Sequence, residues 1–417
     1  MTTTTIDRHQ AAGGGAEPLR IFIIAGEHSG DALGAKLMAA LRVASQREIR
    51  FIGVGGEHMA QQGLSTLYPL SDIAVMGPLA IARRLPSLVA KVYATVDAVL
   101  AAEPDILVII DAPEFTHPIA KRVRKRRPGL PIVDYVSPTV WAWRPGRAAK
   151  MRAYIDHVLA LLPFEPAAHR ELGGPPCTYV GHPLTERLPM IAALDPAGFA
   201  REYGIDTGRP VLVVLPGSRR SEVERLMGVF GDAVALVAAR HPGLQVLIPA
   251  MPGVRAMIEA KLATWPHASC KPVVFAGEVE TQKFAAFKLA RAALAASGTV
   301  TLELALARTP MVVAYRVDVV ISTLRHLIKA KSAVLPNLIT GGHAIPEYLQ
   351  EPCTAENLSA AVDQLLRDTP ERAAQLAQID RVPGLLALAN GTPSDAAAAV
   401  VMAHVGSVPG FSLAPTG

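Results

Sequence analysis

The sequence predicts an α/β protein built from two doubly wound parallel sheets. Short, continuous apolar runs alternate with segments of helical periodicity, which is the pattern of a buried parallel sheet with helices on both faces. Most of these runs end in glycine, proline or a polar residue, as strands do before a turn. The same alternation begins again after Pro189, so we expect two Rossmann-like domains of similar size.

The first half opens with the apolar run at residues 19–25, followed by a glycine-containing turn and a helix to about Val43. Four or more consecutive apolar residues at this position favour a strand buried on both faces. The remaining elements of this half are predicted as strands at 49–54, 105–110, 131–136 and 157–162, and helices at 86–102 and 117–127.

The second half opens with the apolar run at residues 210–215, a proline-glycine turn and a long helix to about Arg240. Its other elements are predicted as strands at 244–249, 272–275, 292–296 and 311–315, and helices at 253–263, 281–289, 299–307, 318–329, 355–368 and 373–379. We therefore expect a disordered leader over 1–18, an N-terminal domain over 19–188, a C-terminal domain over 189–370, and helices with a loose tail over 371–417.

The composition limits the class of protein. Of the 417 residues, 50% are hydrophobic and 18% are charged, yet no unbroken apolar run approaches the roughly 18–20 residues of a spanning helix. This argues against an integral membrane protein. The net charge of +5 is compatible with an anionic ligand or an anionic membrane surface. The three cysteines have no CxxC spacing, which indicates a reducing compartment, neither a disulfide framework nor a zinc site, and the cytosol by default.

Polar turns follow the first and third predicted strands of the first half. Glu27, His28, Ser29 and Asp31 precede a helix, where they can bind a ligand or simply form a capped turn. Asp111 directly follows a buried strand. A carboxylate there can act as a general base, although a loop-capping role is equally compatible, and Pro113 is expected to end the strand.

Two turns of the second half carry groups suited to a phosphate. Gly217, Ser218 and Arg219 lie between a strand and a helix, where the arginine fork and the helix N-terminus favour a diphosphate. The second turn has Ser297, Gly298 and Thr299, with Glu303 one helical turn further on, where a carboxylate can bind the hydroxyls of a ribose. The alternative for both turns is an ordinary capped helix with solvated side chains.

Three further segments of the first half can bind a ligand or a surface. Trp141 and Trp143, followed by arginines, could stack on a sugar or anchor a loop on the core. The run 121–127 carries six positive charges in seven positions, and residues 75–99 interleave apolar side chains with cations. Such segments bind anionic lipid or acyl chains, but they also occur as solvated or core-packed amphipathic helices.

Taken in order, these motifs resemble those of the lipid-A-disaccharide synthase family of inverting glycosyltransferases. The resemblance covers about residues 19–370, and its ordered set is far more specific than any single motif. The motifs that carry it are AGEHSGD (25–31), DAPEF (111–115), YVSPTVWAWRPGR (135–147), LPFE (162–165), VGHPL (180–184), LPGSR (215–219), ASGTVTLE (296–303) and LPNLI (335–339). His28 and His343 depart from the family pattern and receive no role.

The resemblance implies a GT-B architecture, in which two Rossmann-like domains face each other across the active-site cleft. It implies that UDP-2,3-diacylglucosamine and 2,3-diacylglucosamine 1-phosphate (lipid X) condense to a β-1,6-linked disaccharide 1-phosphate and UDP. No metal, cofactor or nucleic acid is expected. The family also suggests a peripheral position on the anionic cytoplasmic face of the inner membrane. A homodimer is compatible with it, with helices beyond residue 370 crossing back onto the first domain.

The resemblance also distributes roles. Asp111 is expected to be the general base for the acceptor 6′-hydroxyl, beside Glu27, Ser29 and Asp31 as acceptor-domain binding candidates. The expected donor-binding residues are Ser218, Arg219, Ser297, Gly298, Thr299, Glu303 and Asn337, with the loop 277–282 near the uracil. Two alternatives stay open: a UDP-sugar 2-epimerase, which needs no apolar acceptor surface, and a non-catalytic sugar-nucleotide or lipid-binding protein.

Overall fold

The computed structural model describes residues 17–73, 78–266, 271–316 and 330–405 of the chain. Most of the predicted leader, Cys270, the predicted helix 318–329 and the C-terminal tail lie outside these residues. The chain divides into two compact units. The first unit takes residues up to 138, residues 151–159 and residues from 394 onward, and the second unit takes residues 139–150 and 160–393.

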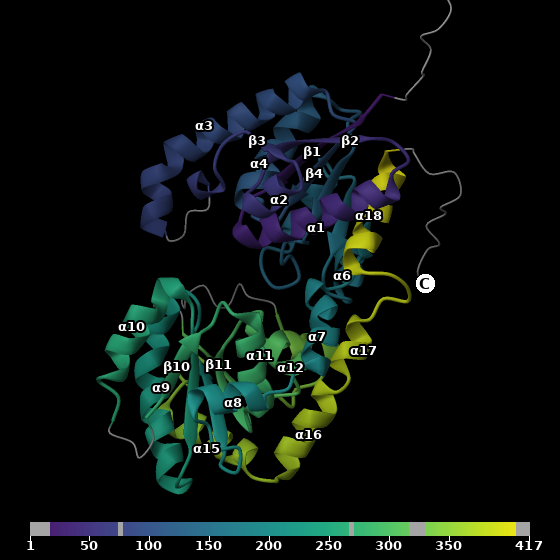
Figure 1. Ribbon diagram of the computed structural model, residues 1–417. Coiled ribbons are helices and arrows are strands. Elements are labelled where there is room, and N and C mark those ends of the chain that lie inside the picture. Colours follow the sequence, from purple (N-terminus) through teal and green to yellow (C-terminus); the bar gives the residue numbers. More distant parts are fainter. Residues whose placement is uncertain (1–16, 74–77, 267–270, 317–329, 406–417) are drawn as a thin grey trace, which may run out of the picture. The chain divides into compact units, whose positions relative to one another are not determined.

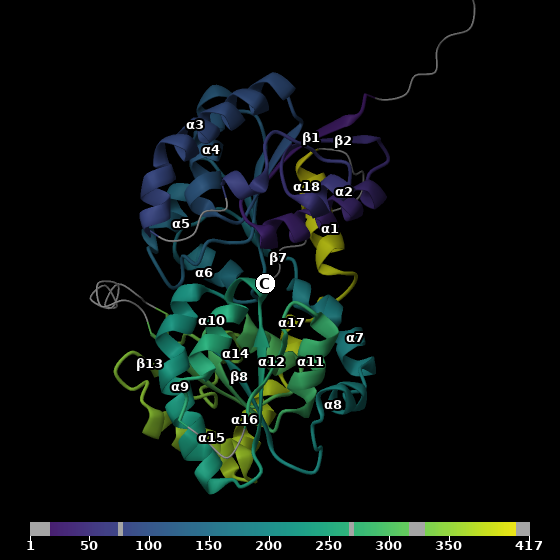
Figure 2. The same ribbon diagram turned by 60° about the vertical axis from the view of Figure 1, so that its left-hand side comes forward.

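Most strands of a seven-stranded sheet, with the order β3-β2-β1-β4-β5-β6-β7, lie in the first unit, whereas β7 belongs to the residues of the second; the strand pairs from β3 to β6 are parallel. The strands are β1 (Leu19–Ala25), β2 (Ile49–Val54), β3 (Ser65–Thr66), β4 (Ile106–Ile110), β5 (Ile132–Tyr135), β6 (His157–Ala160) and β7 (Cys177–Tyr179). Figures 1 and 2 show α3 and α4 together on one face of this sheet and α1 and α18 on the other. The helices are α1 (His28–Ala44), α2 (Glu57–Gln61), α3 (Pro78–Ala102), α4 (Pro113–Arg126) and α18 (Pro393–His404).

The second unit contains a six-stranded parallel sheet with the order β10-β9-β8-β11-β12-β13. Its strands are β8 (Val211–Leu215), β9 (Gln245–Ala250), β10 (Val273–Ala276), β11 (Ala292–Ala296), β12 (Met311–Tyr315) and β13 (Glu347–Leu349). Its main helices are α9 (Arg220–Arg240), α10 (Pro252–Leu262), α11 (Glu280–Leu289), α12 (Val300–Leu306), α14 (Leu335–Thr340), α15 (Ala355–Leu366), α16 (Pro370–Ile379) and α17 (Val382–Leu386). Shorter helices are α5 (Gly146–Met151), α6 (Glu165–Glu171), α7 (Leu188–Ala193) and α8 (Ala197–Tyr203).

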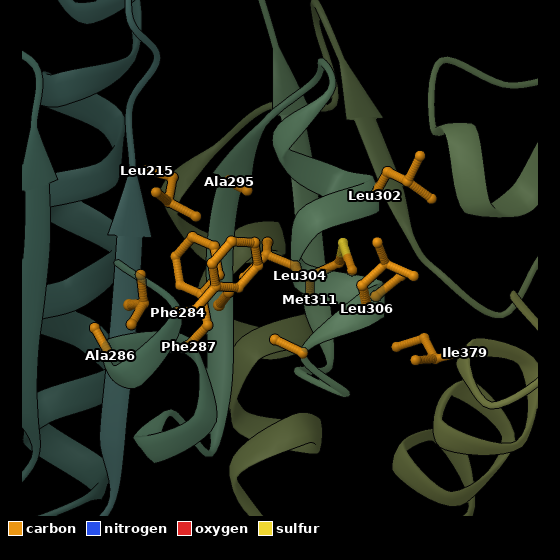
Figure 3. Packing of buried hydrophobic residues seen from close by; sticks show 14 of the residues in the cluster. Leu215, Phe284, Ala286, Phe287, Ala295, Leu302, Leu304, Leu306, Met311 and Ile379 are labelled. Atoms are coloured by element: carbon orange, nitrogen blue, oxygen red, sulfur yellow. The ribbon is translucent and has the colours of Figure 1, made fainter. Parts of the chain in front are cut away.

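Two hydrophobic clusters cover the two faces of the second sheet. Alternate residues of β8 point to opposite sides, so Val211 and Val213 join one cluster and Leu212 and Val214 join the other. The first cluster packs the sheet against α11, α12 and α17, and Figure 3 shows its phenylalanines and leucines from close by. The second packs the sheet against α9, α10 and α15. Burial on both faces explains why these strands are continuously apolar.

The predicted strands are confirmed to within about two residues, but two helix starts are wrong. Helix α4 begins at Pro113 rather than at residue 117, because proline at the first helical position lacks only an N–H that would have no helical partner. Helix α3 begins at Pro78 and contains Pro86, which the sequence analysis took as its start. The described elements α14 and β13 were not predicted, because their short sequences lack a clear periodicity, and α17 and α18 were expected only as helices without bounds within 371–417.

Helix α3 also corrects the argument about membrane spans. By length and composition alone, Arg84–Ala102 could cross a bilayer, although it is not an unbroken apolar run. Val92, Val96 and Val99 are buried on the inner face of this helix. Leu85, Val89 and Tyr93 repeat every four residues and are 44–53% exposed. The helix is therefore amphipathic, with a second apolar stripe that the first unit leaves uncovered.

Candidate active site

A pocket of about 350 Å³ lies in the second unit, at the carboxyl ends of the adjacent strands β8 and β11. This is where open parallel sheets bind ligands. Its lining comes from the β8–α9 turn, the β11–α12 turn, α12, α11 and the ends of β9 and β10. The residues that face it include Gly217, Ser218, Arg219, Glu222, Pro249, Met251, Gly277, Lys283, Ser297, Gly298, Thr299 and Glu303.

The β8–α9 turn is closed by a carboxylate of its own helix. Glu222 accepts hydrogen bonds from the backbone N–H groups of Ser218 (3.1 Å) and Arg219 (3.2 Å), in a capping box. Gly217 has φ +113°, and a Cβ atom there would lie 2.4 Å from Glu222 Oε2. Glycine is therefore required at this position, and Glu222 rests against it. The Arg219 side chain is largely exposed and reaches the pocket.

The β11–α12 turn lines the pocket with Ser297, Gly298 and Thr299. Ser297 Oγ donates to the Ala333 carbonyl at 2.6 Å, which ties the turn to the segment before α14. Thr299 is the N-cap residue of α12, but its side chain makes no capping hydrogen bond. No atom lies within 4 Å of the position that a Cβ on Gly298 would occupy. The backbone of this turn is thus open to a ligand of the pocket.

Glu303 lies on the first turn of α12 and is paired across the pocket wall. Lys283 Nζ donates to Glu303 Oε1 at 2.9 Å, and the two side chains are only 16% and 15% exposed. Lys283 comes from α11, whose first turn overlaps the predicted uracil loop 277–282. Glu303 was predicted as a site residue from the sequence, whereas Lys283 was not. Its position one residue beyond that loop was the available signal.

Asn337 is buried and does not belong to the pocket lining. Its amide nitrogen donates to the Ile345 carbonyl and to Glu347, both at 2.9 Å. Its amide oxygen accepts from Gln378 at 2.7 Å. These hydrogen bonds use both N–H donors of the amide group and one acceptor position of its oxygen. They hold α14 against neighbouring segments of the second unit.

In the first unit, Asp111 follows β4 in a strained conformation. Asp111 and Ala112 both have positive φ, +56° and +45°. The Asp111 carboxylate accepts from the backbone N–H of Ala112 (2.7 Å) and from Ser29 Oγ (3.3 Å). Ser29 belongs to α1, which follows the neighbouring strand β1. Two consecutive non-glycine residues at positive φ cost energy, and such strain clusters at functional sites.

The other polar residues after β1 have different surroundings. Asp31 is buried, and its carboxylate accepts from the backbone N–H groups of Gly56, His58 and Met59, between 2.7 and 3.1 Å. Asp31 therefore caps α2 and is occupied by the chain itself. Glu27 is exposed at the N-cap position of α1. Asp111 and Ser29 are in contact, whereas Asp31 is directed to α2.

The tryptophan loop is anchored on the second unit. Trp141 packs edge-on against Phe164, with ring centroids 5.1 Å apart, and its indole N–H donates to Glu165 at 3.2 Å. Glu165 also accepts from the backbone N–H groups of Leu161 and Leu162. Burial raises the pKa of Glu165 to about 7, despite these hydrogen bonds. For Trp141, the geometry is that of a loop anchor.

Comparison with known proteins identifies the family. The family model described as Lipid-A-disaccharide synthetase matches residues 21–398. The chain belongs to this family. It is 49% identical to the lipid-A-disaccharide synthase of Rhodopseudomonas palustris (strain HaA2) over 92% of this chain and 95% of that protein. It is 50% identical to the enzyme of Nitrobacter hamburgensis, with the same coverage.

Solved structures agree with the fold of this lipid-A-disaccharide synthetase family member. The UDP-GlcNAc 2-epimerase of Neisseria meningitidis bound to UDP-GlcNAc has a TM-score of 0.63 at 12% identity, covering 92% of this chain and all of that one. A glycosyltransferase from Rickettsia africae has a TM-score of 0.54 at 11% identity, covering 93% and 98%. At these identities the likeness shows the fold alone, which is the GT-B plan of two Rossmann-like units.

For this family member, the structure brings together six of the predicted site residues in one pocket. These are Ser218, Arg219, Ser297, Gly298, Thr299 and Glu303. Ser29 and Asp111 meet in the first unit, and Asn337 and Asp31 are engaged elsewhere. Among the described residues, no group of three or more His, Cys, Asp or Glu side chains is arranged to hold a metal ion.

Proposed function

We propose that the chain is a lipid-A-disaccharide synthase, which transfers 2,3-diacylglucosamine from its UDP conjugate to lipid X and releases UDP. Membership of the family supports the activity. The single structural observation that carries it is the pocket at the ends of β8 and β11, where an arginine, three hydroxyl residues and a carboxylate paired with a lysine converge. The likeness to UDP-GlcNAc 2-epimerases is a likeness of fold and gives no reason to prefer that reaction.

In the proposed donor site, the diphosphate lies between the two turns of the pocket. Arg219 supplies a cationic fork, and the backbone of Gly298 and Thr299 supplies N–H donors. Glu303 accepts hydrogen bonds from the ribose hydroxyls. The charge that develops on UDP as it departs is stabilised by Arg219 and by these donors. Asn337 is proposed to support the site through α14 rather than through contact with the nucleotide.

In the proposed reaction, Asp111 is the general base. It accepts the proton of the acceptor 6′-hydroxyl while that oxygen attacks the anomeric carbon of the donor sugar. The bond from this carbon to the β-phosphate oxygen breaks, UDP leaves with the electron pair, and the anomeric configuration inverts. The strained backbone at Asp111 and its hydrogen bond to Ser29 support this role, because they hold the carboxylate in one orientation.

The decisive experiment supplies the purified full chain with UDP-2,3-diacylglucosamine and lipid X and follows UDP release together with the disaccharide product. Both products in equal amounts are expected. UDP release without disaccharide would indicate a hydrolase, and interconversion of UDP-sugar epimers would favour the epimerase. Absence of all three, beside an active synthase as control, would contradict the proposal.

We also propose that the first unit binds the anionic cytoplasmic face of the inner membrane. The exposed apolar stripe of α3 and the basic residues of α4 form one surface, because the Arg122 guanidinium lies 4.8 Å from the Tyr93 ring centroid. Arg126 also pairs with Asp97 of α3 at 2.8 Å. Apolar side chains flanked by cations suit an interface of anionic lipids. The homodimer is still a prediction, and a measurement of the molecular mass in solution tests it.

A further inference from the structure

Lys283 is the one cation of the pocket wall to which the proposed reaction gives no role, among the residues that the structure describes. It stands on α11, and its ammonium donates to Glu303 Oε1 of α12 at 2.9 Å. Both residues line the pocket. The Lys283 ammonium also lies 5.5 Å from the ring centroid of the buried Phe284. The contact joins the helix that follows β10 to the helix that follows β11.

The ion pair between Lys283 and Glu303 is largely buried, so each charge depends on the position of the other. With exposures of 16% and 15%, each charge loses much of its hydration, and a buried charge left without its partner is strongly destabilised. The lysine must therefore keep the Glu303 carboxylate in place when a ligand is absent. The pKa of Arg187 is raised, mainly by its hydrogen bond to Glu280. The negative charge of the nearby Glu303 makes a smaller contribution in the same direction. Glu303 is thus held in a cationic environment.

A carboxylate has about four acceptor positions on its two oxygens. Lys283 occupies one position on Oε1, which leaves Oε2 and the remaining position on Oε1 for other donors. Two neighbouring hydroxyl groups of a ribose present two donors with matching separation. A carboxylate of fixed orientation accepts both, whereas a carboxylate that can rotate loses part of this advantage to conformational entropy.

We propose that Lys283 is a positioning residue for ribose recognition: it binds one oxygen of Glu303 and orients the carboxylate toward the 2′- and 3′-hydroxyls of the nucleotide. The inference rests on the proposed function, since it takes the UDP moiety as the ligand of this pocket. It makes Lys283 a determinant of sugar specificity. A direct contact between Lys283 and the diphosphate is the competing role, and the two roles predict different responses to removal of the 2′-hydroxyl.

The test measures the Kd of UDP and of 2′-deoxy-UDP by calorimetry on the full chain. Because a hydrogen bond to a charged acceptor is involved, the wild type is expected to prefer UDP by on the order of tenfold. Lys283→Met should lose most of this preference, mainly because UDP binds more weakly while 2′-deoxy-UDP changes little. The double variant Lys283→Met/Glu303→Gln should be no worse than Glu303→Gln alone.

Lys261→Met is the matched control, because it removes the same charge from α10, outside the pocket lining, and should leave both Kd values unchanged. Equal weakening of both nucleotides by Lys283→Met would overturn the proposal in favour of phosphate contact or a purely structural role. Unchanged preference would overturn it as well. Lys283→Arg, which can keep the ion pair and the fold, should retain part of the preference, and its complete loss there would also count against the proposal. A wild type that binds no UDP would instead contradict the proposed function.

Discussion

Glu222 Oε2 lies 3.1 Å from the backbone nitrogen of Ser218, so a carboxylate of the chain already occupies a donor of the proposed diphosphate site. We expect Glu222→Ala to lower the free energy of unfolding by about 1 kcal/mol through loss of the capping box. We also expect it to tighten UDP binding, by roughly fivefold, because a negative charge leaves the pocket. Thermal unfolding and calorimetry measure the two effects.

The control for this prediction is Glu224→Ala, on the same helix but exposed. It removes an equal charge without touching the turn, and neither quantity should change measurably. Weaker UDP binding in Glu222→Ala would mean that the carboxylate organises the turn for the nucleotide rather than competing with it.

Asp111→Asn should abolish the chemistry without abolishing nucleotide binding. Loss of a general base typically lowers kcat by about 10²–10⁴-fold. The amide is nearly isosteric: its oxygen can accept from the backbone N–H of Ala112 and its NH2 group can donate to Ser29 Oγ, so the fold should be retained. Initial rates of UDP release and the Kd of UDP separate the two effects. Asp97→Asn, an exposed residue of α3, is the control, and wild-type kcat in Asp111→Asn would remove this residue from the role of base.

Gly26→Ala tests how closely β1 and the turn after β4 approach each other. A Cβ atom on Gly26 would lie 2.2 Å from the Cβ of Ala112, next to Asp111. The turn must then move, which should cost about 1–3 kcal/mol of stability and displace the Asp111 carboxylate. Gly129→Ala, where no atom lies within 4 Å of the new Cβ, should leave stability and turnover nearly unchanged. Full activity in Gly26→Ala would show that the turn adapts freely.

Glu165 should make the stability of the second unit depend on pH. Its pKa is raised from an ordinary value of 4.5 to about 7, with burial as the main cause, so the folded state binds its proton more tightly than the unfolded state. The stabilisation by this proton is fully present below about pH 4.5 and is lost as the pH rises through about 7. The loss from this group amounts to at most about 3 kcal/mol.

Chemical unfolding of the wild type and of Glu165→Gln at several pH values between 4 and 8 measures this effect. Glutamine has one acceptor oxygen in place of two, so the variant cannot keep both the Trp141 indole N–H and the backbone N–H groups of Leu161 and Leu162 as donors, and its absolute stability shifts at every pH. The predicted signature is the difference between the two proteins, which should change with pH across this window. A constant difference would contradict the raised pKa.

Leu85→Ser/Val89→Ser should weaken binding to vesicles that contain anionic lipid. Both side chains are exposed on the outer stripe of α3, and each loses burial in the membrane interface when it becomes polar. In flotation experiments, we expect the ratio of vesicle-bound to free protein to fall by at least about tenfold. Val43→Ser, an even more exposed apolar residue on α1, is the control. Equal loss in both variants would mean that the stripe has no special part in membrane contact.

The sequence by itself determined the strands and the turns that follow them. Strands buried on both faces must be continuously apolar, and this local pattern ends where the chain leaves the sheet, as at Leu215 and Ala296. Because the carboxyl ends of adjacent parallel strands meet at one edge, Ser218, Arg219 and Thr299 could be expected to share a pocket, and they do. Glu303 followed from its place one turn into the next helix.

The tertiary structure alone decided which polar groups are already occupied and which partner each one has. Asp31 is committed to α2, Asn337 to the segments around α14, and Glu303 to Lys283, which comes from a different helix. The hydrogen bonds Gly56–Asp31, Asn337–Glu347 and Lys283–Glu303 join residues that are 25, 10 and 20 positions apart in the sequence. Helix packing and strand register bring such residues together, and the periodicity of a single segment carries no information about the side chain that it will meet in another.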